Sequence, residues 1–195
     1  WPTTDPRKRQ TILYSGQSDG GPAQGGYGAT LPPYAPGSGL DQPFWNKKVY
    51  SDPLMRQFTG QIFGNGGASW INHRILRYAD VILMIAEASN ELGDGVTAAA
   101  NLELIRKRAS GNLGVSRTIV PVIPFINQAQ MRAAIKNERR WEFAMEGYRF
   151  YDLVRWGDAI AELGPLGYTN RCRFYPLPQK AIALSGGVLI QNPEW

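Results

Sequence analysis

The chain has 195 residues, of which 43% are hydrophobic and 19% charged, and its formal net charge is +5. A chain of this length can bury roughly 70% of its unfolded surface in one domain, and this composition excludes a wholly disordered protein. The basic residues alternate with acidic ones, as in Glu138-Arg139-Arg140, so the excess positive charge does not indicate a nucleic-acid interface.

Several kinds of site are excluded by residue usage. Cys172 is the only cysteine and His73 the only histidine, which excludes an internal disulfide and most zinc or nucleophile-base sites. The loop acids lack EF-hand spacing, and the glycine-rich segment 20–28 lacks the ending of a phosphate loop. We therefore predict no metal and no cofactor, with a calcium site made of oxygen ligands as the alternative that stays open.

The longest apolar stretch, residues 81–86, falls far short of the roughly 20 residues that span a bilayer. The sequence opens on Trp1, without a start methionine or a basic-then-apolar leader. We expect a preceding segment, and we expect any membrane anchor to lie in it.

The first part of the chain, residues 1–70, is repeatedly interrupted by glycine and proline. Short strand-like stretches occur only at residues 11–14 and 58–63. Irregular segments of this length inside a compact protein are uncommon and are often functional. We therefore predict a loop-rich region that faces a ligand and rests on a helical base.

Apolar residues at helical spacing begin near residue 75 and continue through much of the remaining chain. Leu76, Ala79 and Leu83, for example, share one helix face, which should be mostly core. Thr97 is a suitable N-cap for the second helix. The predicted helices, in chain order, are residues 75–92, 97–109, 128–145, 148–162 and 179–184.

The first two predicted helices should form an antiparallel hairpin, because only Gly93-Asp94-Gly95 and a short turn separate them. Gly147 predicts a bend between the third helix and the fourth. The tail from residue 164 onward should be largely extended, since Pro176 and Pro178 disfavour helix at the residues before them.

Four sequence blocks follow one another in the helical part. Residues 77–88 read RYADVILMIAEA, 101–109 read NLELIRKRA and 137–157 read NERRWEFAMEGYRFYDLVRWG, and the tail contains YPLP and QNP. This series resembles the C-terminal half of the SusD/RagB family, and Asp5-Pro6-Arg7 resembles the segment that opens that half. The resemblance covers essentially the whole chain and is weakest in the glycine-rich loops.

The resemblance implies a mostly α fold, a SusD-like helical scaffold with a tetratricopeptide-like helix pair and long irregular loops. Residues 1–195 are then a single C-terminal domain of the SusD/RagB type. It comprises a ligand-facing loop region at 1–70, a helical core at 71–163 and an extended tail at 164–195.

The same resemblance implies a non-catalytic lipoprotein at the outer-membrane surface of a Bacteroidetes-type bacterium. It would capture an oligosaccharide and deliver it to a SusC-like TonB-dependent transporter, with a peptide ligand, as in RagB-like proteins, as the alternative. Contact with the membrane would be made only through an N-terminal lipid anchor that is absent from this chain.

The carboxylates of Glu138, Glu142 and Glu146 share one helix face, and such a pair could serve as acid and base. Arginines surround them, however, and a nearby arginine lowers a carboxyl pKa, whereas a general acid needs a raised one. We therefore predict a partly buried network of structural ion pairs, in which Arg149→Ala destabilises the fold. Its predicted members are Arg77, Asp80, Glu142, Glu146, Arg149, Asp152 and Arg155.

Aromatic and amide side chains are interspersed through the loop region, a combination that suits the apolar face and hydroxyls of a sugar. The predicted ligand-binding residues are Trp45, Trp70, Tyr34, Tyr27, Asn46 and Arg74. The alternative is that these rings pack the loops onto the helices. Two rival functions remain open, a helical glycoside hydrolase using Asp41 or Asp52 and a module that binds another polypeptide.

Overall fold

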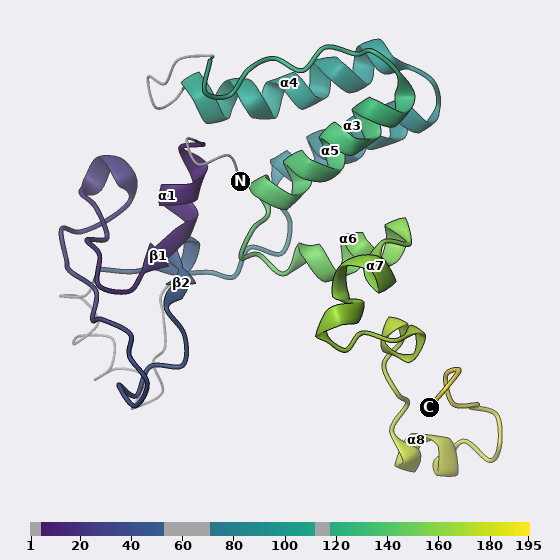
Figure 1. The fold of residues 1–195 in the computed structure, drawn as a ribbon. Helices are drawn as coiled ribbons and strands as arrows, with labels where there is room; N and C mark the ends of the chain where they lie inside the picture. The colour runs from purple at the N-terminus through teal and green to yellow at the C-terminus, as the bar shows by residue number, and fades with distance from the viewer. Residues whose placement is uncertain (1–4, 53–70, 112–117) are drawn as a thin grey trace. The chain divides into compact units, whose positions relative to one another are not determined.

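The computed structural model describes residues 5–52, 71–111 and 118–195. Contacts divide the chain into two compact units, residues 1–146 and 147–195, which are described separately. The described elements are mainly helices, with one pair of short strands (Figure 1). The predicted mostly α fold class is confirmed. The predicted strand at 58–63 and the predicted site residue Trp70 lie outside the described residues.

The first unit opens with a short helix, α1, Arg7–Thr11, which continues directly into strand β1, Ile12–Tyr14. Strand β2, Phe44–Asn46, pairs with β1 in antiparallel register, with Leu13 opposite Trp45. The strand expected at 11–14 is thus confirmed as β1. Neither α1 nor β2 was predicted, because five and three residues are too few to show an apolar period.

Two 3-10 turns complete the loop region: η1, Pro22–Gln24, and η2, Lys47–Val49. The second follows β2 without a break. Asn46 caps it, since its side-chain oxygen accepts a hydrogen bond from the Lys48 N–H. Lys47 and Lys48 lie in this capped turn, directly after the strand.

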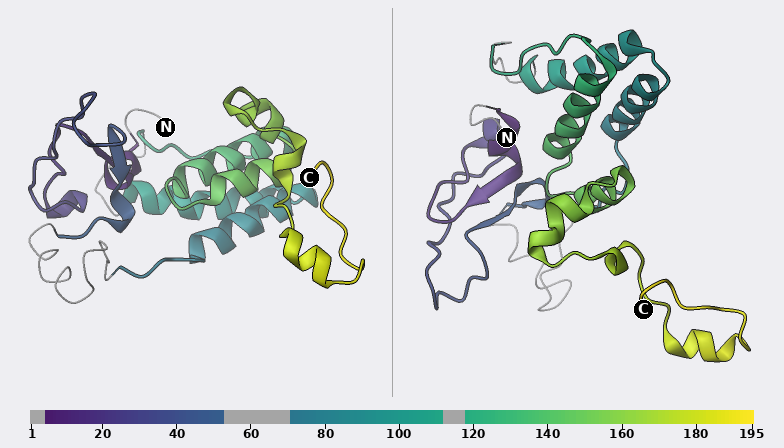
Figure 2. Two further views of the ribbon diagram at one scale, coloured as in Figure 1. Left: turned by 90° about the horizontal axis from the view of Figure 1, so that it is seen from below. Right: turned by 45° about the vertical axis from the view of Figure 1, so that its right-hand side comes forward.

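Three helices form the core of the first unit: α3, Tyr78–Glu91, α4, Gly95–Gly111, and α5, Gln128–Glu142. Each contacts the other two, and Figure 2 shows them grouped together. Their buried faces carry large aliphatic side chains at helical spacing. The fully buried ones include Leu83, Leu102, Ile105, Met131 and Ile135.

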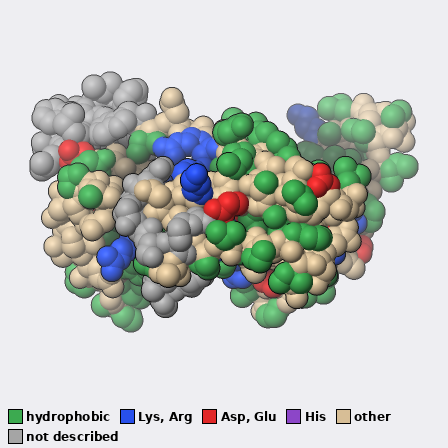
Figure 3. Space-filling view, turned by 90° about the horizontal axis from the view of Figure 1, so that it is seen from above, with side chains coloured by type: hydrophobic (Ala, Val, Ile, Leu, Met, Phe, Trp, Pro, Cys, Tyr) green, Lys and Arg blue, Asp and Glu red, His purple; other side chains and the backbone are tan. Residues whose placement is uncertain are grey.

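The helical hairpin predicted at residues 75–92 and 97–109 corresponds to α3 and α4, and its bounds need two corrections. Asp94, not Thr97, caps α4, because its carboxylate accepts a hydrogen bond from the Thr97 N–H at 3.0 Å. Helix α3 begins at Tyr78, so Ile75 and Leu76 precede it and are exposed rather than core. Several further apolar side chains of the helices are also exposed, and hydrophobic side chains are spread over the surface in Figure 3.

The second unit contains α6, Tyr148–Trp156, α7, Ala159–Leu163, and α8, Gln179–Leu184. The predicted helix 148–162 is therefore two helices. The break lies at Gly157, which has a left-handed φ of 77° and ends α6. Two further 3-10 turns lie between α7 and α8, η3 at Gly164–Leu166 and η4 at Asn170–Arg173.

The tail folds back on itself, and side chains that hydrogen-bond to distant backbone groups hold it in this conformation. The Gln191 amide donates to the Leu177 carbonyl at 3.0 Å and accepts from its N–H at 2.8 Å. The Trp195 indole N–H donates to the carbonyls of Arg171 and Phe174. Across the described residues, no helix combines the length and the apolar character that crossing a bilayer requires.

Candidate functional site

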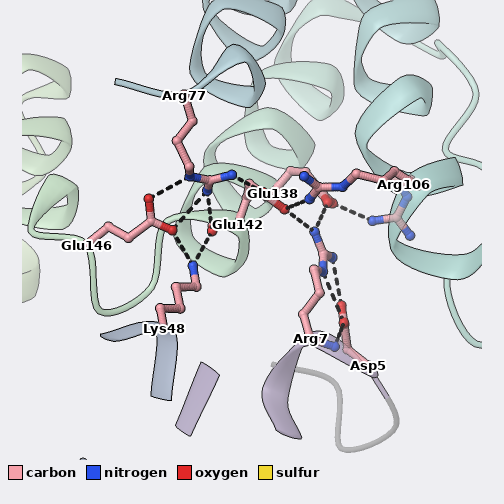
Figure 4. Close-up of polar contacts among 9 residues, drawn as sticks. Asp5, Arg7, Lys48, Arg77, Arg106, Glu138, Glu142 and Glu146 are labelled. Atoms are coloured by element: carbon pink, nitrogen blue, oxygen red, sulfur yellow. Dashed lines mark hydrogen bonds and ion pairs between the residues drawn. The ribbon is translucent and has the colours of Figure 1, made fainter. Parts of the chain in front are cut away.

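A cluster of buried charges joins α1, η2, α4 and α5 to the residue before α3 (Figure 4). These elements meet at one face of α5, which carries Glu138 and Glu142 on its last two turns. We call this set the ion cluster. Its members are Asp5, Arg7, Lys48, Arg77, Arg106, Arg108, Glu138, Glu142 and Glu146.

Glu138 is the most deeply buried carboxylate of the ion cluster and has no exposed surface. One oxygen accepts from Arg7 at 2.5 Å and the other from Arg106 at 2.6 Å. Arg7 in turn holds Asp5 in a two-bonded contact, with its Nη2 2.7 Å from a carboxylate oxygen. These contacts fix α1 against α5, which explains why five residues without an apolar period are helical.

Glu142 receives three arginines. Burial alone would raise its pKa, but the positive charges of Arg108, Arg77 and Arg7 outweigh burial and lower the pKa. The corresponding nitrogen-oxygen distances are 2.5, 3.0 and 3.3 Å. The carboxylate therefore stays ionised and is fully engaged, so it is unsuited to act as a general acid.

Glu146 lies at the edge of the ion cluster, beyond the end of α5. Arg77 donates to both of its carboxylate oxygens, at 2.8 and 2.9 Å, and Lys48 binds one of the same oxygens. Lys48 also donates to the Glu142 carbonyl at 2.7 Å. The structure thus brings Arg77, Glu142 and Glu146 together, as the predicted network requires.

The other predicted ion-pair residues lie outside the ion cluster. Asp80 pairs with Arg139 at 2.7 Å, inside the three-helix core. Asp152 pairs with Arg155 within α6. Arg149 differs from the prediction, because it pairs with Glu162 at 3.4 Å and both side chains are substantially exposed. Arg149→Ala would therefore leave no buried carboxylate unpaired, which removes the reason for the predicted destabilisation.

Three of the loop rings are exposed: Tyr27 at 49%, Phe44 at 44% and Tyr34 at 42%. Trp45 is only partly exposed, and it lies opposite the buried Leu13 across the two strands. Residues directly opposite in an antiparallel pair share a face, so Trp45 faces the same side as Leu13. Phe44, opposite Tyr14, is the more accessible ring of this strand.

The loop that presents Tyr27 is held by a single buried carboxylate, Asp19. It accepts from the Tyr27 N–H at 3.0 Å and from the Tyr50 hydroxyl at 2.9 Å. These hydrogen bonds outweigh the effect of burial and lower the pKa of Asp19. The rings of Tyr27 and Tyr50 also pack together, with centroids 5.5 Å apart. The exposed Tyr27 ring is therefore fixed in place.

A cavity of about 560 Å³, which we call the loop pocket, opens between α1, β1 and the Asp19 loop. Its volume is within the range of small-molecule sites. Its lining mixes one aromatic ring with amides, a hydroxyl and cations, which is suitable for a polar ligand with several hydroxyl groups. The lining includes Lys8, Arg9, Tyr14, Gln17, Ser18 and Gln24.

Two of the predicted binding residues, Asn46 and Arg74, meet at a small cavity of about 70 Å³. The Asn46 amide is already used, because it donates to the Met145 carbonyl at 2.7 Å and accepts from Lys48. Arg74 is exposed and also lines a second, larger cavity beside the ion cluster.

The SusD family profile matches residues 1–172. The chain belongs to this family. The SusD-like resemblance noted in the sequence is thereby confirmed. The ion cluster of this SusD-family chain lies wholly within the matched residues.

Curated relatives come from Formosa agariphila. SusD-like protein P2 is 29% identical over 174 residues, which is 81% of this chain and 34% of that protein. SusD-like protein P38 is 38% identical over 104 residues, 53% of this chain and 21% of that protein. The chain therefore spans about a third or less of the length of these SusD-like relatives.

Solved SusD-like structures match nearly the whole chain. A SusD-like protein from Bacteroides fragilis has a TM-score of 0.71 and 27% identity, covering 98% of this chain and 39% of that one. A SusD homologue from Bacteroides thetaiotaomicron has a TM-score of 0.65 and 23% identity, covering 100% and 41%, and shows the fold alone.

Sequence reasoning missed most of the loop-pocket residues in this SusD-family chain. Lys8, Gln17 and Gln24 are ordinary polar residues without a motif. Their segments are joined by Lys47, which donates to the carbonyls of Arg9 and Asp19. Asp19 gave a usable signal, since an acid directly before Gly20-Gly21 often bonds the backbone of its own turn.

Proposed function

We propose that this chain is part of a non-catalytic nutrient-capture protein that binds a glycan at the cell surface. The observation that carries the proposal is membership of the SusD family across residues 1–172. We further propose that the whole protein is a lipid-anchored outer-membrane protein that passes its ligand to a SusC-like TonB-dependent transporter.

The loop region supplies the surface that we propose for the glycan. Tyr27 offers an exposed, fixed ring on which the apolar face of a sugar can stack. The loop pocket offers the amides of Gln17 and Gln24 and the hydroxyl of Ser18 for hydrogen bonds to sugar hydroxyls. A fixed ring costs little conformational entropy when it orders a ligand, which favours binding.

The geometry of the acidic residues supports a binding role over hydrolysis. Glu142, at the end of α5, and Glu146, just beyond it, are held by arginine and lysine, so neither is available for proton transfer. The rival hydrolase would have to use loop acids such as Asp41 or Asp52. Peptide capture, as in RagB-like proteins, or binding of another polypeptide would use the same exposed rings. Only a binding experiment distinguishes these alternatives from glycan binding.

The test is calorimetric titration of the protein with an oligosaccharide panel, beside a matched peptide panel. We expect an oligosaccharide to bind, and we expect Tyr27→Ala to weaken binding roughly tenfold, which is about 1.4 kcal/mol. Gln17→Ala should also weaken it, because this side chain lines the loop pocket. Tyr78→Ala is the matched control, since it removes an even more exposed tyrosine ring from α3, outside the loop region.

Binding of peptides but not glycans would replace the glycan with a peptide ligand. Conversion of an oligosaccharide, abolished by Asp41→Asn or Asp52→Asn, would show an enzyme and overturn the proposal. Equal losses from Tyr27→Ala and Tyr78→Ala would remove the loop region as the binding surface. The proposed transporter partner is tested by co-purification with a SusC-like protein from outer membranes.

A further inference from the structure

A second cavity, of about 340 Å³, lies directly beside the ion cluster. We call it the arginine pocket. Residues from α1, η2, α4, α5 and the segment before α3 contribute to it, so it lies where these elements converge. The side chains that matter for its chemistry are Gln10, Lys48, Arg74, Arg77, Arg108 and Trp141.

Cations outnumber carboxylates around the arginine pocket. The ion cluster and Arg74 together contain six cations, Arg7, Lys48, Arg74, Arg77, Arg106 and Arg108, against the carboxylates of Asp5, Glu138, Glu142 and Glu146. Two positive charges therefore remain after every carboxylate is neutralised. In a partly buried cavity such an excess attracts an anion more strongly than it would in open water.

Unused donors point to the same ligand chemistry. Arg74 has no hydrogen-bond or ion-pair partner among the residues that the structure describes. Arg108 uses one nitrogen, Nη2, on Glu142, and its side chain is 43% exposed. A guanidinium has five N–H donors arranged for two-bonded contact with a carboxylate or sulfate. Both arginines can therefore bind an anion without leaving a buried carboxylate unpaired.

One wall of the arginine pocket is aromatic. Trp141 lines the pocket from α5 and is partly exposed. An indole ring beside guanidinium groups gives an apolar surface next to a charged one, and the Gln10 amide adds a neutral donor and acceptor. This combination fits a small ligand that carries its negative charge on a compact organic body.

We propose that the arginine pocket is a binding site for the carboxylate or sulfate group of a small anionic ligand, held by Arg74 and Arg108. The two arginines come from the segment before α3 and from α4, so an anion between them would be bound from two sides. This site does not depend on the proposed glycan function of the loop region.

The test is calorimetric titration at low ionic strength with glucuronate, inorganic sulfate and, as the uncharged comparison, glucose. We expect both anions to bind and glucose not to bind. Arg74→Gln should weaken anion binding about tenfold, the loss typical of one charge-assisted hydrogen bond. It should leave the melting temperature unchanged, because the Arg74 side chain makes no contact on which folding depends.

Lys107→Gln is the matched control. It removes one positive charge from α4, next to Arg108, at an exposed position that does not line the pocket. We expect it to leave anion binding nearly unchanged, whereas Arg108→Gln should weaken it. Equal weakening by Arg74→Gln and Lys107→Gln would show a general charge effect and overturn the site, as would binding of neither anion. Glycan binding at the loop pocket is measured in a separate titration. The outcome for the arginine pocket therefore neither supports nor contradicts the proposed glycan function.

Discussion

At the scale of single residues, the buried carboxylates of α5 hold distant segments of the first unit together. Glu138, for example, contacts both Arg106 and Arg7, which lies 131 residues earlier in the chain. A buried ion pair contributes little to stability in comparison with apolar packing, but removing one partner leaves an uncompensated buried charge. Such residues are therefore sensitive to substitution whatever the net contribution of the pair.

Glu138→Gln should lower the free energy of unfolding by about 3–5 kcal/mol, because Arg7 and Arg106 would lose the anion between them. Urea denaturation followed by circular dichroism measures this change. Arg149→Ala is the comparison, since Arg149 pairs with an exposed Glu162 and should change stability little. Similar losses of unfolding free energy in both variants would contradict the greater importance that we assign to the buried ion pairs of α5.

At the scale of elements, the loop from Asp19 to Thr30 has a defined conformation although η1 is its only regular element. Its two ends meet, because the Asp19 N–H donates to the Ala29 carbonyl and Gly28 donates to Gly20. Gly26 lies buried at the closest approach. A Cβ added there would lie 2.2 Å from the Gly20 oxygen and 2.3 Å from the Asp19 oxygen.

Gly26→Ala should therefore open this loop and release the Tyr27 ring, since backbone oxygens cannot move aside without breaking its hydrogen bonds. We expect faster amide exchange at Tyr27 and weaker ligand binding, with the three-helix core intact. Gly21→Ala is the matched control, because a Cβ there meets nothing within 4 Å and its φ is −84°. Normal exchange at Tyr27 in Gly26→Ala would show that the loop tolerates a side chain.

At the scale of the whole molecule, paired carboxylates make stability depend on pH. Burial raises the pKa of Asp5 and of Glu142, but neighbouring arginines outweigh it, so both values lie below the ordinary 3.8 and 4.5. A lowered folded-state pKa means that the unfolded chain binds protons first as pH falls. The stabilisation is therefore complete above the ordinary values and is lost as pH falls through the lowered ones.

We expect the free energy of unfolding to be nearly constant between about pH 5 and neutral pH and to fall as pH decreases below about 4.5, the ordinary value for a glutamate. Denaturation curves at a series of pH values measure this slope. Glu142→Gln should be less stable at neutral pH and should show a shallower slope, since one of the linked protons is gone. Equal slopes in the two proteins would assign the acid sensitivity to other groups.

The local sequence was sufficient for the elements whose signals are close together in the chain. Helices α3, α4, α5 and α8 were predicted because apolar spacing, caps and glycines lie within each segment. The involvement of Arg77 with Glu142 and Glu146 was also expected, from charges on facing helices. The sequence blocks were enough to indicate the family.

Tertiary structure alone decided features that depend on residues far apart in the sequence. Helix α1 exists because Arg7 reaches Glu138 on α5, and strand β2 exists because β1 lies beside it. The same pairing placed Trp45 on the side of Leu13, and convergence of five segments created the arginine pocket. A short segment has too little local preference to set its own conformation, so its long-range partners determine it.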